Sequence, residues 1–348
     1  MLITAAVAAL AMTQGNTQEM RLLRYPSVHG NQLLFTYAGD LWTADSDNAL
    51  ARRLTAHPNN ESRARYSPDG SMIAFTSSYD GNDDVYVMPA DGGEPKRLTF
   101  DSVPENVVGW TPDGKVAFIS VAGSISNRMP RLWLVDPKGG LPQPTPVLEA
   151  ADVSFSPDGS KVAYHRMNSN QFNWRHYRGG TQGRISIFDL KSDTYSELPS
   201  GDFNSYSPMW IGNSIYFVSD RELDCINLYR YDLGSKSTKR LTDFKMGDIK
   251  WPSTDGKTIV FERDGYLYEF DTANDKLTQV NPRVQSDVVA ARPSLKKLGP
   301  QITYATLSPS SVRIAVEARG EIFSVPVKSG DTRNITNTQS ARERFPNW

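Results

Sequence analysis

The sequence has almost no cysteine, little histidine, no excess of either charge and no long apolar run, and each shortage excludes a class of protein. The single cysteine, Cys225, cannot form an internal disulfide, so no disulfide framework holds this fold. The 38 basic and 39 acidic side chains give a net charge of -1, which excludes a nucleic-acid partner bound by bulk charge. The remaining composition, 39% hydrophobic and 22% charged, is typical of a water-soluble globular chain.

Only the N-terminus is strongly apolar. Residues 2–12 carry no charge, a run too short to span a bilayer but typical of the central part of a secretory signal. No Lys or Arg precedes this run, and the first basic residue is Arg21. We interpret residues 1–21 as a leader derived from an export signal whose basic start is missing. The predicted location is periplasmic or secreted, and a cytoplasmic start is the alternative.

Residues that commonly carry chemistry do not gather in functional patterns. The histidines are neither closely paired nor placed beside cysteine, as metal ligands usually are; they are His29, His57, His165 and His176. No GxSxG nucleophile motif is present, and the nearest string, residues 212–216, lacks the second glycine. The sequence therefore predicts no catalytic residue, no metal and no cofactor in this chain. Cys225 is interpreted as a small apolar residue at a strand edge rather than a nucleophile.

What the sequence does contain is a repeat. The turn SPDG or TPDG centres on Asp69, Asp113 and Asp158, which are 44 and 45 residues apart, and a variant, STDG, centres on Asp255. Gly30-Asn31 and Gly212-Asn213 supply the turn in two further copies. A fixed period of this length indicates stacked supersecondary units, and propeller blades of four strands run to about 40–45 residues.

Each copy predicts four strands. An aromatic residue closes the first strand and a tight Asp-Gly turn follows. The second strand follows this turn, and the third strand alternates apolar and polar residues, which is typical of a half-buried antiparallel strand. The fourth strand ends in an Arg-Leu-Thr motif in several copies, as at residues 53–55, 97–99 and 240–242. The closing aromatics are Tyr66, Trp110, Phe155, Trp210 and Trp251. We interpret them as packing between blades rather than as a ligand site.

The predicted fold is all-β: a six-bladed β-propeller of four-stranded antiparallel blades, followed by the first blade of a second propeller. The domain boundaries are 1–21 for the leader, 22–282 for the propeller, 283–300 for a linker, and 301–348 for the start of the second propeller. Trp348 stands where Trp110 stands before its own turn. The chain therefore looks like a fragment, and we expect further blades after Trp348.

Two segments are more specific than the turn motif. The string WRHYRGG occupies residues 174–180, and SDRELDCINLYRYDL occupies residues 219–233. They resemble the fourth- and fifth-blade segments of Tricorn-type proteases, with His176 where that family usually has Lys. The repeat count and the onset of a second propeller are also similar, so the resemblance covers residues 22–348.

The resemblance implies a non-catalytic role for this chain. Tricorn-type serine peptidases cut oligopeptides with a Ser and a His in later domains beside a PDZ module. This chain would then be a scaffold and a peptide passage, with oligopeptides and the downstream propeller, PDZ and peptidase domains as partners, in a parent that forms a homo-oligomer. Neither nucleic acid nor a membrane span is expected. The alternatives are a stand-alone TolB-like binding propeller, and the propeller of a dipeptidyl-peptidase-like enzyme.

One charge pattern remains. Residues 159–188 and 114–135 contain basic residues and no acid, and both stretches include the connection from second to third strand. Arg forks suit carboxylates, and the resemblance implies that arginines of the first propeller hold the carboxylate at a substrate's C-terminus. The candidate substrate-binding residues are Arg128, Arg131, Arg175 and Arg178. The alternative is a solvated face, or a face that docks another domain.

Overall fold

The computed structural model describes residues 18–47, 49–124, 126–166, 175–222, 225–284, 299–338 and 341–348. Most of the expected leader, Trp174 and most of the expected linker lie outside these residues. The chain divides into two compact units, residues 1–286 and residues 287–348, and each is described by itself. Among the described residues, no helix has the length and apolar character needed to cross a bilayer.

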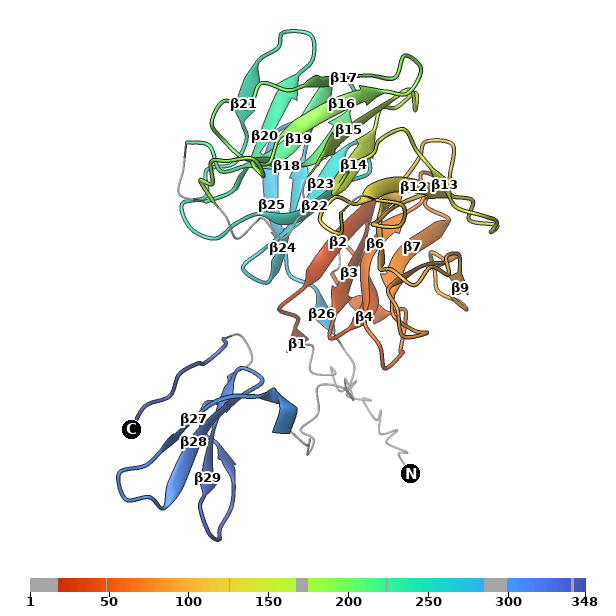
Figure 1. The fold of residues 1–348 in the computed structure, drawn as a ribbon. Coiled ribbons are helices and arrows are strands. Elements are labelled where there is room, and N and C mark those ends of the chain that lie inside the picture. Colours follow the sequence, from red (N-terminus) through yellow and green to blue (C-terminus); the bar gives the residue numbers. More distant parts are fainter. Residues whose placement is uncertain are drawn as a thin grey trace, which may run out of the picture. The chain divides into compact units, whose positions relative to one another are not determined.

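The described part of the first unit contains six four-stranded antiparallel sheets, each formed by consecutive strands in the order of the chain (Figure 1). We number these sheets as blades 1 to 6. The strands are β2 (Arg24–His29), β3 (Gln32–Tyr37), β4 (Asp40–Asp45) and β5 (Ala51–Arg53) in blade 1; β6 (Glu61–Tyr66), β7 (Met72–Ser77), β8 (Asp84–Pro89) and β9 (Lys96–Arg97) in blade 2; β10 (Glu105–Trp110), β11 (Val116–Ser120), β12 (Arg131–Val135) and β13 (Gln143–Pro144) in blade 3; β14 (Asp152–Phe155), β15 (Lys161–His165), β16 (Ile185–Asp189) and β17 (Thr194–Glu197) in blade 4; β18 (Ser205–Ile211), β19 (Ser214–Ser219), β20 (Asn227–Asp232) and β21 (Thr238–Arg240) in blade 5; and β22 (Lys250–Thr254), β23 (Thr258–Arg263), β24 (Tyr266–Asp271) and β25 (Lys276–Val280) in blade 6.

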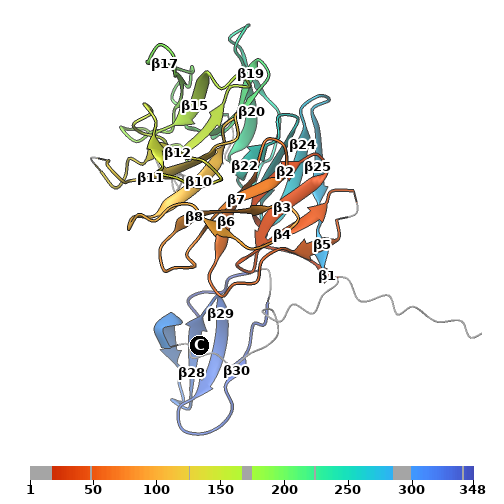
Figure 2. The same cartoon turned by 90° about the vertical axis from the view of Figure 1, so that its right-hand side faces the viewer.

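The first strands of the six blades form a closed ring. Strand β2 packs beside both β6 and β22, and the strands between them follow in the same way, β6 beside β10, β10 beside β14, β14 beside β18 and β18 beside β22. Figure 2 shows the same sheets from the side. The all-β propeller predicted from the repeat is thereby confirmed, and the inner strand of every blade borders a central channel.

A small clasp joins the two ends of the ring. Strand β1 (Gln18–Glu19) pairs antiparallel with β26 (Arg283–Val284), and the Arg283 N–H donates to the Ala49 carbonyl of blade 1 at 2.7 Å. A residue that precedes blade 1 is thus bonded to residues that follow blade 6. This pairing ties the N-terminal and C-terminal ends of the first unit together.

Apolar cores lie between neighbouring blades rather than inside any one blade. One cluster combines Leu34 and Leu41 of blade 1 with Ile73 and Phe75 of blade 2, and equivalent clusters join blades 2 and 3, 3 and 4, 4 and 5, and 5 and 6. Every face of a blade needs a neighbour, because a single sheet cannot bury its apolar side alone.

In blades 1 and 2 the Arg-Leu-Thr motif fastens the fourth strand through hydrogen bonds. The hydroxyls of Thr55 and Thr99 accept the backbone N–H of Leu41 and Val85 at 2.8 and 2.9 Å, just inside the third strand. The arginine two residues earlier pairs with the acid that begins that strand, as in the 2.7 Å contact between Arg97 Nη2 and Asp84 Oδ2. The motif therefore fastens the short fourth strand to the third.

The second unit contains one more sheet of the same kind, formed by β27 (Ile302–Leu307), β28 (Arg313–Ala318), β29 (Glu321–Pro326) and β30 (Arg333–Asn334) after a short 3-10 helix, η3 (Gly299–Gln301). Its Thr336 hydroxyl accepts the N–H of Ile322 at 3.0 Å. The same closing bond thus occurs in both units.

Candidate functional site

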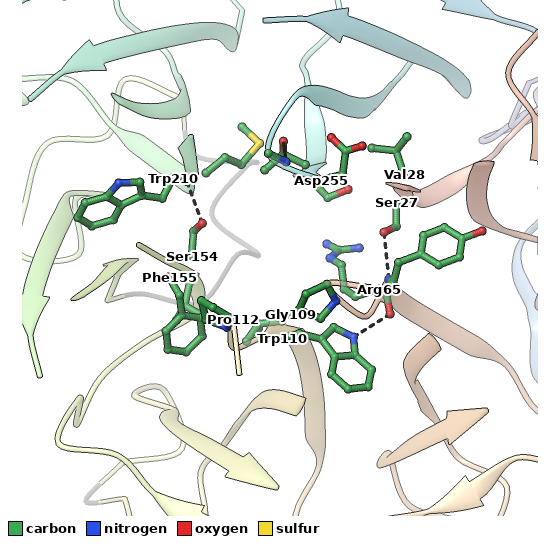
Figure 3. Close-up of a pocket in the computed structure, with 18 of the residues that line it drawn as sticks. Ser27, Val28, Arg65, Gly109, Trp110, Pro112, Ser154, Phe155, Trp210 and Asp255 are labelled. Carbon is green, nitrogen blue, oxygen red and sulfur yellow. Dashed lines mark hydrogen bonds between the residues drawn. The ribbon is translucent and has the colours of Figure 1, made fainter. Parts of the chain in front are cut away.

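The main candidate site is the mouth of the central channel on the side of the Pro-Asp-Gly turns. A cavity of about 330 Å³ is lined there by residues from the inner strand of every blade. Figure 3 shows Ser27, Arg65, Gly109, Ser154 and Asp255 arranged around the opening. The inner strands place these side chains on the channel wall because alternate residues of a strand face the same side.

The strand-end aromatics point away from this opening. In Figure 3 the rings of Trp110, Phe155 and Trp210 are directed outward from the cavity, and each packs against a cluster between two blades. The Trp110 Nε1–H also donates to the Arg65 carbonyl of the preceding blade at 3.0 Å. The interpretation of these aromatics as packing between blades is confirmed.

Trp251 differs from the other four aromatics. It is the second residue of β22 rather than its last, and it stands at a bulge with a φ of 50°. The sequence placed it at the end of the strand because it precedes the STDG turn by a short interval. Blades 1, 2 and 5 have a bulge at the same place, so the bulge does not set Trp251 apart. The turn of blade 6 runs from Thr254 to Thr258 and is two residues shorter than the turn from Tyr66 to Met72, so the strand continues past Trp251.

Arg65 is the most prominent charged group on the channel wall. Its Nη1 donates to the carbonyls of Ala64 and Pro26 at 3.0 and 3.4 Å, and burial lowers its pKa to about 10. The guanidinium therefore remains charged at neutral pH. It projects toward the cavity in Figure 3, where it would meet a ligand entering the mouth.

A second group of side chains lies two residues further along the inner strands, away from the turns. The Arg63 guanidinium is centred 4.7 Å from the Trp251 ring and 5.8 Å from the Tyr25 ring, and these two rings lie 4.8 Å apart. Because blade 1 stands between blades 2 and 6, Arg63 reaches across the inner face of blade 1 to contact Trp251. This cation–π cluster links the inner strands of blades 1, 2 and 6.

Sequence reasoning missed both Arg63 and Arg65. A signal was present, because the strand ESRARY carries two arginines on alternate positions where other copies have small or apolar residues. Strict alternation would place both side chains on one face, but a bulge between Ser62 and Arg65 interrupts it. Only the closed ring makes Arg65 part of the channel wall.

Of the predicted anchor residues, Arg128 and Arg131 belong to blade 3. Arg128 is exposed and lies in the connection before β12. Arg131 begins β12, and its guanidinium is centred 5.8 Å from the Trp133 ring. Neither of the two forms an ion pair among the described residues.

Arg175 and Arg178 belong to the connection between β15 and β16 in blade 4. Arg175 Nη1 lies 3.6 Å from Asp248 Oδ1, which follows blade 5, and Arg178 lies over the ring of Phe203 at 5.5 Å. The His176 N–H donates to Asp220 Oδ2 of blade 5 at 2.6 Å. The described part of this connection therefore rests on blade 5.

The local excess of basic residues is largely balanced by acids distant in sequence. Arg166 contacts Glu149 at 2.8 Å, Arg184 contacts Glu197 at 2.8 Å, and Lys161 contacts Asp189 at 3.6 Å. Together with Arg175 and Asp248, four of the five basic residues between 159 and 188 have an acidic partner. Arg178 is the exception among the described residues.

Cys225 is buried, and its thiol donates to the Phe244 carbonyl at 2.9 Å. Burial raises the pKa of this thiol, which keeps it in the unreactive protonated form. Its assignment as a small buried residue rather than a nucleophile is supported by both observations.

A closed ring of four-stranded blades with a lined central channel defines the first unit as a β-propeller. Residues 20–276 match the family described as the Tricorn protease N-terminal beta propeller domain, and the chain belongs to this family. The resemblance seen in its motifs is thus confirmed.

Individual relatives agree with this assignment. The chain is 31% identical over 331 residues to "Tricorn protease homolog 1" of Streptomyces coelicolor, covering 93% of this chain and 30% of the relative. A crystal structure of the tricorn protease superposes with a TM-score of 0.68 at 25% identity, over 92% of this chain and 32% of that one. The structure described as a TolB from Agrobacterium tumefaciens has a TM-score of 0.53 at 18% identity, over 65% of this chain and 82% of that one, which shows a shared fold alone. The chain spans about a third of the tricorn relatives that it matches.

Proposed function

We propose that this chain is the non-catalytic propeller portion of a Tricorn-like serine protease that degrades oligopeptides. Its role would be that of a scaffold and of a passage that admits unfolded peptides and rejects folded protein. The observation that carries the proposal is the channel mouth of about 330 Å³, lined by all six blades and carrying Arg65.

The proposal includes partners and a location. Oligopeptides would enter the channel, and the chain would work together with the downstream propeller, PDZ and peptidase domains of a homo-oligomeric parent. The apolar run at residues 2–12 favours export to the periplasm or the medium, with the cytoplasm as the alternative.

Catalysis is expected to require those further domains. The purified chain should not hydrolyse a fluorogenic oligopeptide, because no nucleophile and base have been identified in its sequence. The measurement is fluorescence release over hours at high protein concentration. Turnover that a serine-directed inhibitor abolishes would contradict the proposal.

The arginines of blades 3 and 4 are proposed to hold the C-terminal carboxylate of a substrate. An ionised contact of this kind contributes roughly 1.5–3 kcal/mol, so a labelled peptide with a free carboxylate should bind at least about tenfold more tightly than its C-terminal amide. Fluorescence anisotropy on the purified chain measures both affinities. Arg128, Arg131 and Arg178 are the stronger candidates, since none of them has an acidic partner among the described residues, whereas Arg175 pairs with Asp248.

Paired variants distinguish a specific contact with the peptide's carboxylate from a general effect of positive charge. Arg128→Ala with Arg131→Ala, and Arg175→Ala with Arg178→Ala, should each reduce the preference for the free acid. Arg184→Ala is the matched control, because it removes a basic residue of the same stretch that pairs with Glu197 on the outer strand. If the unmodified chain bound the free acid and the amide equally, the anchoring role would be wrong and these arginines would form a docking surface instead.

A TolB-like binding propeller is the second candidate. The similarity in fold to a TolB structure favours it, whereas the family match favours the first candidate. A folded protein partner bound more tightly than any unfolded peptide would support the TolB-like role.

A further inference from the structure

Blade 3 borders a cavity near the end of its second strand, β11. It has a volume of about 290 Å³ and lies between the outer part of blade 3 and the connection from blade 2. Its walls include Glu105, Phe118, Ala122 and Trp133. The equivalent place in blade 2 holds a side chain that blade 3 lacks.

In blade 2 a tyrosine fills the equivalent space. The stacked pair Phe75 and Tyr86, with ring centres 5.8 Å apart, is covered by Tyr79, whose ring lies 4.8 Å from Tyr86. The Tyr79 hydroxyl donates to Glu61 Oε1 at 2.7 Å, and Thr55 donates to the other carboxylate oxygen at 2.9 Å. The buried carboxylate of Glu61 is thus fully engaged.

Strand register identifies the equivalent residues of blade 3. Phe75 pairs with Tyr86 and Phe118 pairs with Trp133 at the same positions of the two hairpins. Tyr79 lies two residues beyond the end of β7, and Ala122 lies two residues beyond the end of β11. Blade 3 therefore has a methyl group where blade 2 has a phenol, and the cavity occupies that space.

Other blades fill this space in their own ways. In blade 5 Arg221 covers the pair Phe217 and Tyr229 at 5.0 and 5.2 Å, and its Nη2 donates to Ser205 at 3.1 Å. In blade 6 the ring of Phe244 lies edge-on to both members of the pair, Phe261 and Tyr268. A covering side chain over the aromatic pair is thus a repeated feature, which blade 3 lacks.

The cavity also contains polar atoms without hydrogen-bond partners. Among the described residues, Glu105 Oε2 and Trp133 Nε1 are buried and neither has a partner. The Glu105 side chain is 3% exposed, and leaving such groups unsatisfied is costly. A phenolic hydroxyl both donates to a carboxylate and accepts from an N–H.

We propose that this cavity is a binding site for the tyrosine side chain of a peptide, which takes the place that Tyr79 occupies in blade 2. The ring would stack against Phe118 and Trp133, and the hydroxyl would donate to Glu105. Phe100 and Leu141 border the cavity and are 73% and 85% exposed, which provides apolar contact for the residues beside that tyrosine. This site is separate from the channel mouth and does not depend on the function proposed for it.

The first test uses two probes that differ by one hydroxyl. Calorimetric titration of the whole chain should show N-acetyl-L-tyrosinamide binding about tenfold more tightly than N-acetyl-L-phenylalaninamide, because the second probe leaves Glu105 unsatisfied. A third probe, p-cresol, carries the phenol ring without a peptide backbone and shows whether the site recognises a peptide tyrosine or any small phenol. Equal affinity for the first two probes, or binding of p-cresol alone, would overturn the proposal.

The second test fills the cavity from within. Ala122→Tyr should abolish binding of N-acetyl-L-tyrosinamide and leave the melting temperature equal or higher, whereas Ala122→Ser, which keeps the cavity, should bind as the unmodified chain does. An Ala122→Tyr protein that still binds the probe, or that melts at a lower temperature, would contradict the proposed shape and chemistry of the cavity.

The third test creates the same site in blade 2. Tyr79→Ala should lower the melting temperature, and N-acetyl-L-tyrosinamide should restore part of the loss by occupying the new cavity. Tyr79→Phe keeps the ring and serves as the control that should show no such rescue. If the probe stabilises Tyr79→Ala no more than Tyr79→Phe, the cavity does not select a phenol.

Discussion

Blade 2 and the sheet of the second unit have the same strand order but very different surroundings. The inner strand of blade 2, β6, has a ring neighbour on each side, and its Glu61 and Ala64 are fully buried. The inner strand of the second unit, β27, leaves Tyr304 and Leu307 exposed by 41% and 52%. A blade's hydrogen-bond pattern is therefore set locally, whereas the burial of its faces depends on neighbours.

The last residues of the chain make the same contacts as the inner strand of blade 3. The Trp348 Nε1–H donates to the Thr306 carbonyl at 3.1 Å, as the Trp110 Nε1–H donates to the Arg65 carbonyl at 3.0 Å. The Phe345 N–H donates to Glu317 Oε2 just as the Val107 N–H donates to the Thr76 hydroxyl, both at 2.9 Å. Residues 345–348 therefore contact the sheet of the second unit in the same way that β10, the inner strand of blade 3, contacts blade 2. The sequence equivalence of Trp348 and Trp110 is confirmed by these bonds.

The largest expected difference between the two sheets concerns apolar burial. Phe75→Ala, at a fully buried position between blades 1 and 2, should lower the free energy of unfolding by about 3–5 kcal/mol. Leu307→Ala, at the half-exposed end of β27, should lower it by less than about 1 kcal/mol. Urea titrations followed by tryptophan fluorescence measure both. A similar cost for the two variants would mean that Leu307 is as well covered as Phe75.

The second expected difference between the two units is the sign of the pH dependence of their stability. Desolvation raises the pKa of Glu61 and Glu105 to about 7, above the ordinary 4.5. Each therefore contributes stability that is complete below pH 4.5 and is lost as the pH rises through 7, by about 2–3 kcal/mol per group. In the second unit, the Phe345 N–H lowers the pKa of Glu317, so its contribution is present above pH 4.5 and is lost as the pH falls.

Unfolding titrations between pH 4.5 and 7.5 measure this effect. Glu61→Gln keeps an oxygen for the Thr55 hydroxyl and cannot ionise, so it should flatten the fall in the stability of the first unit. Glu317→Gln is the matched change in the second unit and should make acid conditions less harmful there. A first unit whose stability rises steadily from pH 4.5 to 7.5, unaltered by Glu61→Gln, would show that these carboxyls titrate normally.

The smallest expected difference concerns the closing threonines. Thr99→Val removes the acceptor of the buried Val85 N–H and should cost about 1–2 kcal/mol. Thr336→Val removes the equivalent bond to Ile322, but its surroundings admit water, so the cost should be under about 1 kcal/mol. Thermal melts compare the two directly. A larger loss for Thr336→Val would show that the closing bond matters more where it is only partly buried.

Much of the fold was predictable because its signals are local. The Gly30-Asn31 and Gly212-Asn213 turns each join two strands as expected, since Asn and Gly favour the positive φ of such hairpins. The fourth strands β5, β9 and β21 each end at the arginine of a predicted Arg-Leu-Thr motif. Trp251 was misplaced because the turn that follows β22 is two residues shorter than the turn that follows β6.

The candidate sites were less predictable because they depend on distant contacts. The basic residues around 159–188 look like one charged surface in the sequence, yet Arg175 is paired with Asp248 and Arg184 with Glu197. Pairing of this kind requires chain segments that are brought together only by folding, so a run of like charges does not define a surface.

The sequence by itself determined the repeat, the four-strand unit, its turns and the family, because each depends on residues within one period of about 44. The tertiary structure alone decided which side chains share a wall. Ring closure placed Arg63 of blade 2 against Trp251 of blade 6, and superposition of neighbouring blades revealed the space that Ala122 leaves over Phe118 and Trp133. The physical reason is that hairpin geometry is fixed by neighbouring residues, whereas a channel or a cavity is defined by surfaces that meet only when the blades pack.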